Sequence, residues 1–521
     1  MLKNIFFPTL WLLLPGLSAF TQNQPPLVTI QSVEVDQAAQ SVTVTYDLED
    51  PEETELEVFL RAAPTGSPNF NISAENVSGA IGFPVSPGTG LQITWNYAGE
   101  IGSDDSYDFK VIADDRYAIP IEELVAQVDS QMLRARMEHI TGVRHYIANS
   151  GNLNRCRDTL EQAFLEYGLE AYRQNFPNIG TTAHNIIGDH WGKTNSNNVI
   201  IIDGHYDTVS DSPGADDNAS AIVGVLEAAR ILSAYHFRKS LRFIGFDFEE
   251  TGLDGSIYYV DHLSNTETIE GVLNLEMIGY YSDAPNSQTF PQGFELLFPE
   301  ANAELEAEDG RGNFLINVGA GFGADLYQAF NEAAATYVPE LRVIGLEIAN
   351  PLLAPVLLRS DHAPFWNAEI PALMLTDGAE FRNPNYHEPS DTIGTLNFTF
   401  IANNVKAAIA TAATMAQPMH SGEAVASNLV ITDASHHHEL PCSYFLSPNP
   451  AQEVFTIRFG DCQPMQLQIR LFDVKGQQIW QGQHDSTAGS LQVPVAHCVP
   501  GVYWLQLSDG HAFSSQRVLI H

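Results

Sequence analysis

The chain has 521 residues, of which 44% are hydrophobic and 17% are charged, so its composition is that of a globular protein and not of a disordered one. Its length exceeds that of one ordinary domain and suggests three. With 24 basic and 64 acidic residues, the net charge is −40, which argues against nucleic acid or an anionic membrane surface as a partner. The acidity fits solubility outside the cell and identifies no substrate.

The first residues have the pattern of a secretory signal peptide. Lys3 supplies a positive start, residues 6–14 are apolar, and small residues follow up to Ala19. We therefore predict a signal peptide over 1–21. No later segment reaches about 18 consecutive apolar residues, so no membrane span is predicted. No cysteine lies near the cleavage region, which argues against a lipoprotein anchor, and we expect an exported mature chain.

Residues 26–117 have an all-β pattern. Short segments alternate apolar with polar residues, and turn residues such as those of 87–90 separate them. This spacing predicts a β-sandwich of the immunoglobulin or fibronectin kind. The segment holds no cluster of metal ligands or nucleophiles, so we interpret it as a structural module. The expected strands are 28–30, 41–46, 56–60, 91–95 and 107–112.

Residues 120–417 alternate between helical and strand-like patterns. The first helical pattern covers 121–147, with Leu124, Val128, Met132 and Met137 on its periodic face. The alternation predicts an α/β fold with an open, mostly parallel sheet and helices on both faces. Further expected helices are 155–167, 219–235, 323–336 and 400–416, and expected strands are 198–203, 241–247, 271–276 and 370–376.

The end of the chain combines a polar segment, predicted as a linker over 418–443, with an all-β pattern over 444–521. The linker contains three consecutive histidines, 436–438. Consecutive positions of an extended chain do not converge on one ion, so a surface tract explains them better than a metal site. In the last segment, strands are expected at 455–459, 467–472 and 502–507.

Four cysteines are present, and their spacing matches no zinc-binding pattern. Cys156 is expected to be a free structural thiol. The other three, Cys442, Cys462 and Cys498, fall in the last 80 residues. An exported protein can form a disulfide among them, but the sequence leaves the pairing open.

The candidate site begins with two short stretches in the α/β segment. An apolar strand ends in Gly-His-Tyr-Asp over 204–207, and Asp-Asn-Ala-Ser over 217–220 precedes a helical pattern. Open α/β sheets bind ligands at the carboxyl ends of their strands. A histidine and carboxylates at such a place, here His205, Asp207 and Asp217, can bind a divalent metal.

Four further stretches bring acids or histidines to the ends of strands. They contain Glu249-Glu250, Glu276, Asp361-His362 and Tyr386-His387. Any one of them alone is a common helix cap or solvated surface, but all of them in one α/β segment are hard to explain in that way. Two zinc ions need two histidines, two terminal carboxylates, a bridging carboxylate and a free carboxylate as base. The residues that supply this inventory are His205, Asp217, Glu250, Glu276, His387 and Glu249.

With these motifs, residues 120–417 resemble the co-catalytic zinc exopeptidases of the bacterial aminopeptidase type, a family that includes glutamate carboxypeptidase-like and glutaminyl cyclase-like relatives. The shared pattern is His-x-Asp, Gly-Ala-Asp-Asp-Asn-Ala-Ser, Glu-Glu, a third strand-end acid and a late histidine. The resemblance covers roughly 300 residues, and the combined motifs are highly specific. The family usually has Asp where this chain has Glu276, so the longer side chain leaves the geometry at that metal less certain.

The resemblance implies a role for each of these residues. Asp217 would bridge two Zn²⁺ ions per chain, and the peptide bond that follows it would be cis. One zinc would also be bound by His205 and Glu276, and the other by Glu250 and His387. Glu249 would act as general base, and Asp207 would orient His205.

The chemistry of the residues agrees with these roles. Two zinc ions roughly 3.5–4 Å apart lower the pKa of a shared water and polarise a carbonyl group. Glu249 would take the proton of the water and pass it to the leaving amine. Asp361 and His362 are expected either to support the site or only to close a loop, and Tyr386 is a weaker candidate for stabilising an oxyanion.

The C-terminal segment resembles the type IX (Por) secretion sorting domain. The motifs are Ser-Pro-Asn-Pro over 447–450, Leu-Phe-Asp-Val-Lys-Gly over 471–476 and Pro-Gly-Val-Tyr-Trp-Leu over 500–505. The resemblance implies passage across the outer membrane with the type IX secretion machinery as a partner. The alternative is a β-module that binds carbohydrate or a surface.

Together these features predict an exported dinuclear zinc aminopeptidase that acts on peptides. A carboxypeptidase or a glutaminyl cyclase-like enzyme of the same fold is the alternative within the family. An inactive surface binding or adhesion protein is the alternative of another class, and the retention of every expected ligand and of the base argues against it. The pocket for the substrate side chain is expected in the loops over 283–320 and 350–385, and no residue there indicates a preference.

Overall fold

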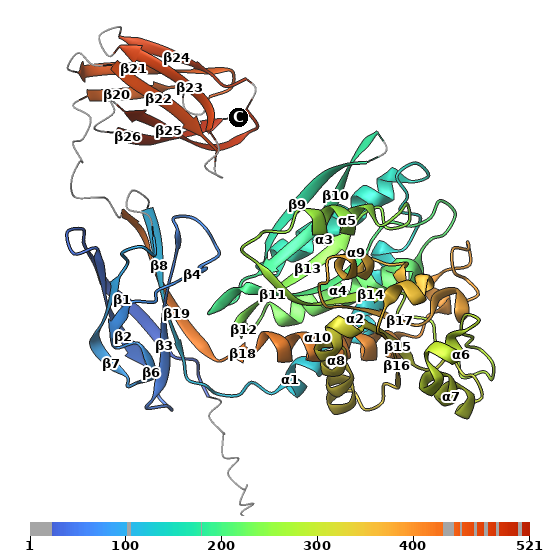
Figure 1. Ribbon diagram of the computed structural model, residues 1–521. Coiled ribbons are helices and arrows are strands. Elements are labelled where there is room, and N and C mark those ends of the chain that lie inside the picture. Colours follow the sequence, from blue (N-terminus) through green and yellow to red (C-terminus); the bar gives the residue numbers. More distant parts are fainter. Residues whose placement is uncertain are drawn as a thin grey trace, which may run out of the picture.

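The computed structural model describes residues 23–101, 106–178 and 180–430, and seven shorter stretches toward the C-terminus. These stretches are 442–448, 451–462, 466–473, 478–485, 489–496, 498–508 and 513–520. The predicted signal peptide, 1–21, and the three histidines of 436–438 lie outside the described residues. An N-terminal β part, a larger α/β part and a C-terminal β part follow one another along the chain (Figure 1).

Two antiparallel sheets share one core in the N-terminal part, as the alternating pattern predicts. Val42, Val44 and Tyr46 are fully buried at alternate positions of one strand, because successive side chains of a strand point to opposite faces. Trp95 of one sheet meets Phe109 of the other edge to face, with ring centroids 6.1 Å apart. In spatial order the sheets are β1 (Leu27–Asp36), β2 (Ser41–Glu49), β7 (Gly88–Asn96) and β5 (Val77–Gly79), and β19 (Ser421–Val430), β8 (Ser106–Asp114), β3 (Leu56–Pro64) and β4 (Ile72–Ser73), with β6 (Gly82–Val85) beside β3.

The structure differs from the sequence prediction at the start of the expected linker over 418–443. Residues 421–430 form β19, which pairs antiparallel with β8 of the N-terminal sheet. Glu423 of β19 lies 3.3 Å from the ammonium group of Lys110 and 3.0 Å from that of Lys193. The α/β part is therefore inserted between two neighbouring strands of one sheet. A sheet edge offers unpaired backbone groups to any suitable segment, so this pairing has no local sequence signal.

The α/β part is built on a mixed eight-stranded sheet, which confirms the predicted fold class. Four neighbouring strand pairs are parallel, β11 with β13 and β14, β14 with β17, and β15 with β16, and the other three are antiparallel. The order is β16 (Val343–Ile348), β15 (Leu315–Ala320), β17 (Ala372–Thr376), β14 (Thr268–Glu276), β11 (Asn195–His205), β13 (Lys239–Phe246), β10 (Thr181–His190) and β9 (Glu170–Asn178). A separate short pair joins β12 (His236–Phe237) to β18 (Pro418–Met419).

Helices cover both faces of this sheet, also as predicted (Figure 1). Alternate residues of β11 enter two different cores: Ile200 and Ile202 enter one, and Val199 and Ile201 enter the other. The first core is shared with α1 (Ile121–Val125), α2 (Ser130–Ile140), α3 (Ser150–Glu166), α4 (Ala221–Leu232), α8 (Ala324–Tyr337) and α10 (Phe398–Ala416). The second is shared with α5 (Asp254–Asp261), α6 (Phe294–Leu297), α7 (Pro299–Ala307) and α9 (His362–Asn367).

Short helical turns complete the α/β part and occupy several of its loops. They are the π-helical turn η1 (Ala215–Ser220) and the 3₁₀ turns η2 (Gly321–Gly323), η3 (Pro351–Leu353), η4 (Pro355–Leu358), η5 (Ala379–Phe381) and η6 (Ile393–Thr395).

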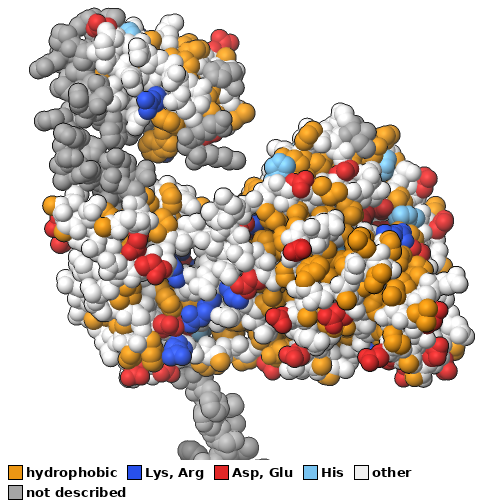
Figure 2. Space-filling view, viewed as in Figure 1, with side chains coloured by type: hydrophobic (Ala, Val, Ile, Leu, Met, Phe, Trp, Pro, Cys, Tyr) orange, Lys and Arg blue, Asp and Glu red, His pale blue; other side chains and the backbone are white. Residues whose placement is uncertain are grey.

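On the face seen in Figure 2, the acidic side chains are scattered and form no single patch, whereas hydrophobic side chains gather on the α/β part.

The prediction of one continuous helical pattern over 121–147 was wrong. The segment forms two helices, α1 and α2, and the Asp129 side chain begins the second by accepting a hydrogen bond from the Gln131 backbone N–H at 2.8 Å. The predicted apolar face also shifts within α2. Met132 is 37% exposed, whereas Leu133 is fully buried, because the helix break changes which residues face the core.

The C-terminal part is all-β, in agreement with the predicted strands. One sheet contains β20 (Cys442–Ser447), β21 (Val454–Cys462) and β24 (Ser490–Pro494). The other contains β23 (Gln478–Asp485), β22 (Gln466–Phe472), β25 (Gly501–Ser508) and β26 (Phe513–Ile520). The backbone register places Cys442 opposite Cys462, while Cys156 and Cys498 are free thiols.

Candidate metal centre

The candidate site lies where three adjacent strands end. His205 is the last residue of β11, Glu276 is the last residue of β14, and Glu249 and Glu250 follow the end of β13. Because these strands are parallel neighbours, their carboxyl ends meet at one edge of the sheet. The turn η1, between β11 and α4, carries Asp217 to the same edge.

Asp217 lies between the two histidines. Its Oδ1 atom is 3.3 Å from His205 Nε2, and its Oδ2 atom is 3.2 Å from His387 Nε2. His205 Nε2 is also 3.5 Å from Glu276 Oε2, and His387 Nε2 is 3.1 Å from Glu250 Oε2. The structure thus brings these five residues together as two groups of donor atoms that share Asp217.

Glu249 lies in the same cluster. Its Oε2 atom is 3.9 Å from His205 Nε2, the longest of the distances between His205 and the surrounding carboxylates. The side chains of His205, Glu249 and Glu276 offer ligand atoms within 4.8 Å of one another, as do those of His205, Asp217 and Glu250. Carboxylate oxygens and imidazole nitrogens at such spacing form a donor set that suits zinc and related divalent ions.

The electrostatics of the site favour a bound cation. Burial raises the pKa of Glu249 well above its ordinary value and that of Glu250 to about 7. Burial acts against the charge of His387 too, but the hydrogen bonds that its ring donates to Asp217 and Glu250 raise its pKa to about 10. Glu250 Oε1 is buried and has no hydrogen-bond partner among the described residues. These residues therefore fit divalent metal ions, which would satisfy the buried oxygen and offset the repulsion between the carboxylates.

Asp207 supports two parts of the site at once. Its Oδ1 atom lies 3.4 Å from His205 Nδ1, on the side of the ring that faces away from the other carboxylates. The same carboxylate accepts hydrogen bonds from the backbone N–H groups of Glu249 at 3.1 Å and Glu250 at 3.3 Å. The family resemblance implies only the first of these contacts, because an acceptor for backbone N–H groups has no spacing signature.

The two consecutive acids of the Asp216-Asp217 pair have separate surroundings. The Asp216 carboxylate accepts hydrogen bonds from the Gly279 N–H at 2.9 Å and from Asn383 at 2.7 Å, and so faces away from the histidines. Asp391 accepts hydrogen bonds from the backbone N–H groups of both acids, at 2.9 Å and 3.1 Å. The Asp217–Asn218 peptide bond is cis, as the resemblance implies.

Glu276 is held by hydrogen bonds despite its longer side chain. Its Oε2 atom accepts one from Ser360 Oγ at 2.7 Å and one from Asn218 Nδ2 at 3.3 Å. Asn218 also donates to the Leu275 carbonyl at 3.0 Å. The sequence does not identify Ser360, Asn218 or Asp391 as supporting residues, because each acts through a contact that only the fold creates.

The structure distinguishes among the weaker candidates. His362 Nε2 bonds the Leu357 carbonyl at 2.7 Å, and burial lowers its pKa to about 4, so this residue closes a loop as a neutral ring. Asp361 is fully buried, and burial raises its pKa to about 7. Tyr386 stacks on the His387 ring with centroids 3.8 Å apart, and its hydroxyl accepts a hydrogen bond from Arg359 at 3.0 Å.

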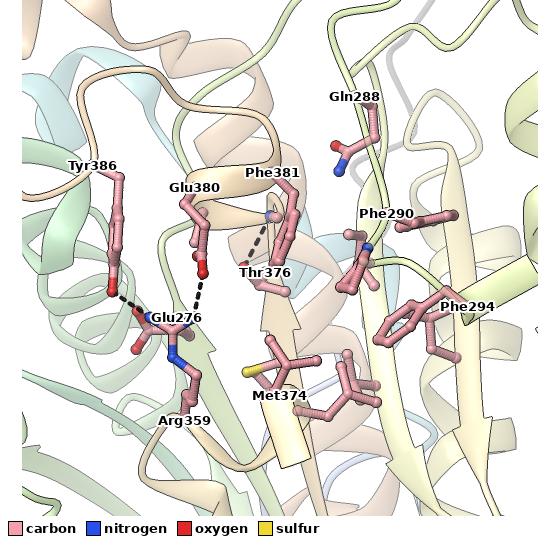
Figure 3. A pocket seen from close by; sticks show the side chains of 18 residues that line it. Glu276, Gln288, Phe290, Phe294, Arg359, Met374, Thr376, Glu380, Phe381 and Tyr386 are labelled. Atoms are coloured by element: carbon pink, nitrogen blue, oxygen red, sulfur yellow. Dashed lines mark hydrogen bonds and ion pairs between the residues drawn. The ribbon is translucent and has the colours of Figure 1, made fainter. Parts of the chain in front are cut away.

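A largely apolar pocket opens beside Glu276. Figure 3 shows Glu276, Arg359 and Tyr386 on one side of it and Phe290 and Phe294 on the other. Most of its lining residues fall within 283–320 and 350–385, the ranges in which the substrate pocket is expected. Its remaining lining residues are mostly apolar: Gln288, Pro291, Ile316, Val318, Leu346, Val356, Leu357, Met374, Thr376, Gly378, Ala379, Glu380 and Phe381.

The C-terminal part matches a known targeting domain. A family described as the secretion system C-terminal sorting domain covers residues 446–521. This match indicates export, with a final location at the cell surface or outside the cell. Among the described residues, no helix combines the length and apolar character that crossing a membrane requires.

The α/β part matches known peptidases. The model of peptidase family M28 covers residues 185–412. The uncharacterized protein YfbL of Escherichia coli is 32% identical over 273 residues, which are 50% of this chain and 80% of that protein. Aminopeptidase YwaD of Bacillus subtilis is 31% identical over 218 residues, 41% of this chain and 40% of the relative.

Solved structures are similar as well. The LapA aminopeptidase of Legionella pneumophila is 21% identical with a TM-score of 0.44, over 57% of this chain and 74% of that one. The match to the family model and the similarity over most of YfbL show the family of the chain, although the match to YwaD spans less than half of that enzyme. The chain belongs to peptidase family M28.

Proposed function

We propose that the chain is an exported dinuclear zinc aminopeptidase. The observation that carries this proposal is the position of Asp217, with one carboxylate oxygen facing each histidine. In the proposed site, Asp217 would contribute to the binding of both zinc ions. His205 and Glu276 would hold one ion with it, and His387 and Glu250 would hold the other. The aminopeptidase name of YwaD supports the same activity.

The proposed mechanism leaves Glu249 free for proton transfer. Zinc ions in a paired site lower the pKa of a water molecule and polarise the carbonyl that is attacked. Since a histidine, a glutamate and the shared Asp217 are assigned to each ion, the Glu249 carboxylate can face the water and act as general base. Asp207 fixes the Glu249 backbone and the His205 ring, so it orients the base and one ligand together.

The surroundings of Arg359 favour the amino end of a peptide over the carboxyl end. A carboxypeptidase needs a cation for the terminal carboxylate of its substrate, and Arg359 lines the pocket. Its guanidinium already forms an ion pair with Glu380 and donates to Tyr386. A free amino group, in contrast, would meet the carboxylates that surround the site. Carboxypeptidase or glutaminyl cyclase-like activity therefore remains the second candidate.

Metal removal tests the dinuclear site. We expect purified protein to hold two zinc ions per chain, and exhaustive chelation to abolish hydrolysis of aminoacyl chromogenic substrates, because all proposed ligands converge on these ions. Readdition of zinc should restore activity. Metal content measured by atomic emission and activity measured on the same samples check this. A single ion per chain would favour the cyclase-like alternative, and a folded, fully active metal-free protein would refute the proposal.

Peptide-library cleavage analysed by mass spectrometry tests which end of a substrate is trimmed. We expect removal of amino-terminal residues one at a time. Removal of carboxyl-terminal residues would support the second candidate, whereas intact peptides after incubation with zinc-loaded protein would support an inactive binding protein.

The apolar pocket predicts a preference for large apolar first residues. Val356, on the turn η4, lines the pocket and is only partly buried, so Val356→Trp should fill space without disturbing the sheet. We expect kcat/KM for leucyl and phenylalanyl substrates to fall roughly 10- to 200-fold, and that for alanyl substrates to change little.

A matched variant controls for the added indole. Val425→Trp makes the same replacement on β19, at a residue that is 46% exposed in the N-terminal sheet, and should leave all substrates unaffected. An equal loss for alanyl and leucyl substrates in Val356→Trp would show that this pocket does not select the side chain.

A further inference from the structure

A fully buried arginine lies behind the loop that joins two of the proposed ligands. The Arg144 side chain has no exposed surface. Its guanidinium donates hydrogen bonds to five backbone carbonyls. They belong to Ile140 at 3.3 Å, Gly142 at 3.1 Å, Tyr206 at 2.6 Å, Pro213 at 3.1 Å and Gly214 at 2.9 Å.

Three of these carbonyls belong to the segment between His205 and Asp217. The backbone of Arg144 adds to this anchoring, because its N–H donates to Thr208 Oγ1 at 2.9 Å and its carbonyl accepts from the Thr208 N–H at 3.1 Å. The Gly142 N–H donates to the Pro213 carbonyl at 2.8 Å. The segment that sets the spacing of His205 and Asp217 is therefore held at both of its ends by residues 142–144.

Close packing leaves this segment no room to relax. Gly214 has φ of +60°, and a Cβ atom at this position would lie 2.8 Å from Arg144 Nη2 and 2.3 Å from the Asp217 carbonyl oxygen. The guanidinium thus packs directly against the turn that begins η1. A shorter or differently shaped side chain at position 144 would leave buried carbonyls without donors, which favours movement of the turn.

The positive charge of Arg144 also acts on the carboxylates of the site. None of its five side-chain hydrogen bonds is to a carboxylate, and no carboxylate among the described residues forms an ion pair with it. Burial lowers its pKa, and the nearby carboxylates of Asp217, Asp207 and Asp391 act in the opposite direction. A fixed positive charge behind acids that must lie close together reduces their mutual repulsion.

We propose that Arg144 is a positioning residue of the metal centre, which fixes the spacing of His205 and Asp217 and offsets part of the charge of the site. This inference rests on the proposed dinuclear zinc site. Substitutions of residues that orient metal ligands typically cost 10- to 100-fold in metal affinity. We expect a loss of this size for Arg144→Met, and a smaller loss for Arg144→Lys, which keeps the charge but cannot reach five carbonyls.

The experiment measures the zinc dissociation constant by competition with a chromogenic chelator, together with thermal unfolding of the zinc-free protein. Arg242→Met is the matched control, because Arg242 is also buried but pairs with Asp189 and Glu267. We expect this control to lower the unfolding temperature and to leave the zinc affinity at the wild-type value. Excess zinc should partly restore the activity of the Arg144 variants.

A milder variant keeps the test decisive if Arg144→Met does not fold. Thr208→Val keeps the shape of the side chain but removes the acceptor of the Arg144 N–H, and should weaken zinc binding by a few fold. Wild-type zinc affinity in Arg144→Lys and Thr208→Val, with lowered unfolding temperatures, would overturn the proposal. Wild-type protein that fails to bind two zinc ions would instead overturn the proposed function, whatever the variants do.

Discussion

Replacing Glu249 with glutamine is expected to lower kcat by roughly 10²- to 10⁴-fold, the usual contribution of a general acid–base group. An amide of the same shape cannot accept the proton of the attacking water. The backbone N–H of residue 249 still donates to Asp207, so the loop should keep its conformation. We therefore expect the variant to retain two zinc ions per chain and to bind substrate with little change in KM. Steady-state kinetics and metal analysis of the same preparation check this.

The control for this change is Glu270→Gln. Glu270 lies near the start of β14, at the end of the strand opposite to Glu276, and pairs with Lys239. The same carboxylate-to-amide change there should leave kcat within about a factor of two of wild type, because a partly exposed ion pair contributes little to the folded state. Wild-type activity in Glu249→Gln would contradict the role of Glu249 as base, and loss of zinc would mean that Glu249 is a ligand.

Replacing Asp217 with asparagine is expected to remove both metals together. The amide keeps one oxygen, but its NH₂ group cannot bind a cation, so one of the two histidines loses its shared partner and the site loses a negative charge. Changes in residues that merely orient ligands cost 10- to 100-fold in affinity, so we expect a loss of more than about 100-fold here. Zinc content after gel filtration should fall well below two ions per chain, and activity should disappear with it.

The neighbouring acid provides a stringent control. Burial, followed by the charge of Asp377, raises the pKa of Asp216 well above its ordinary value, and an asparagine resembles the protonated form of that acid. Asp216→Asn should therefore fold and keep two zinc ions. If Asp216→Asn lost zinc while Asp217→Asn kept it, the bridging residue would be Asp216 and not Asp217.

Much of the central sheet could be predicted from the sequence because its inner strands are buried on both faces. The expected strands at 198–203, 241–247, 271–276 and 370–376 are the four adjacent strands β11, β13, β14 and β17. Such strands appear as short apolar runs. The outer strands β9, β10 and β16 are partly exposed and carry polar residues, and Asn317 and Gly319 interrupt the apolar run of β15, so these strands have no clear pattern.

The pairing of β19 could not be predicted for a different reason. Its contact with β8 joins residues as distant as Lys110 and Glu423, 313 positions apart. A segment of ten residues with mixed polarity suits either a linker or an edge strand. The choice between them depends on whether a free sheet edge lies nearby, which is a property of the folded chain.

The sequence by itself determined the kind of chemistry available to this protein: the histidines and acids at strand ends, the family and the export domain. These are local signals, because the position of a side chain at the end of a strand is set by a few neighbouring residues. Only the tertiary structure decided how these groups face one another, including the orientation of Asp217 between two histidines, the second role of Asp207, the anchoring by Arg144 and the apolar pocket. Each of these depends on side chains and carbonyls from distant segments, whose directions are set by long-range packing and hydrogen bonding and not by spacing along the chain.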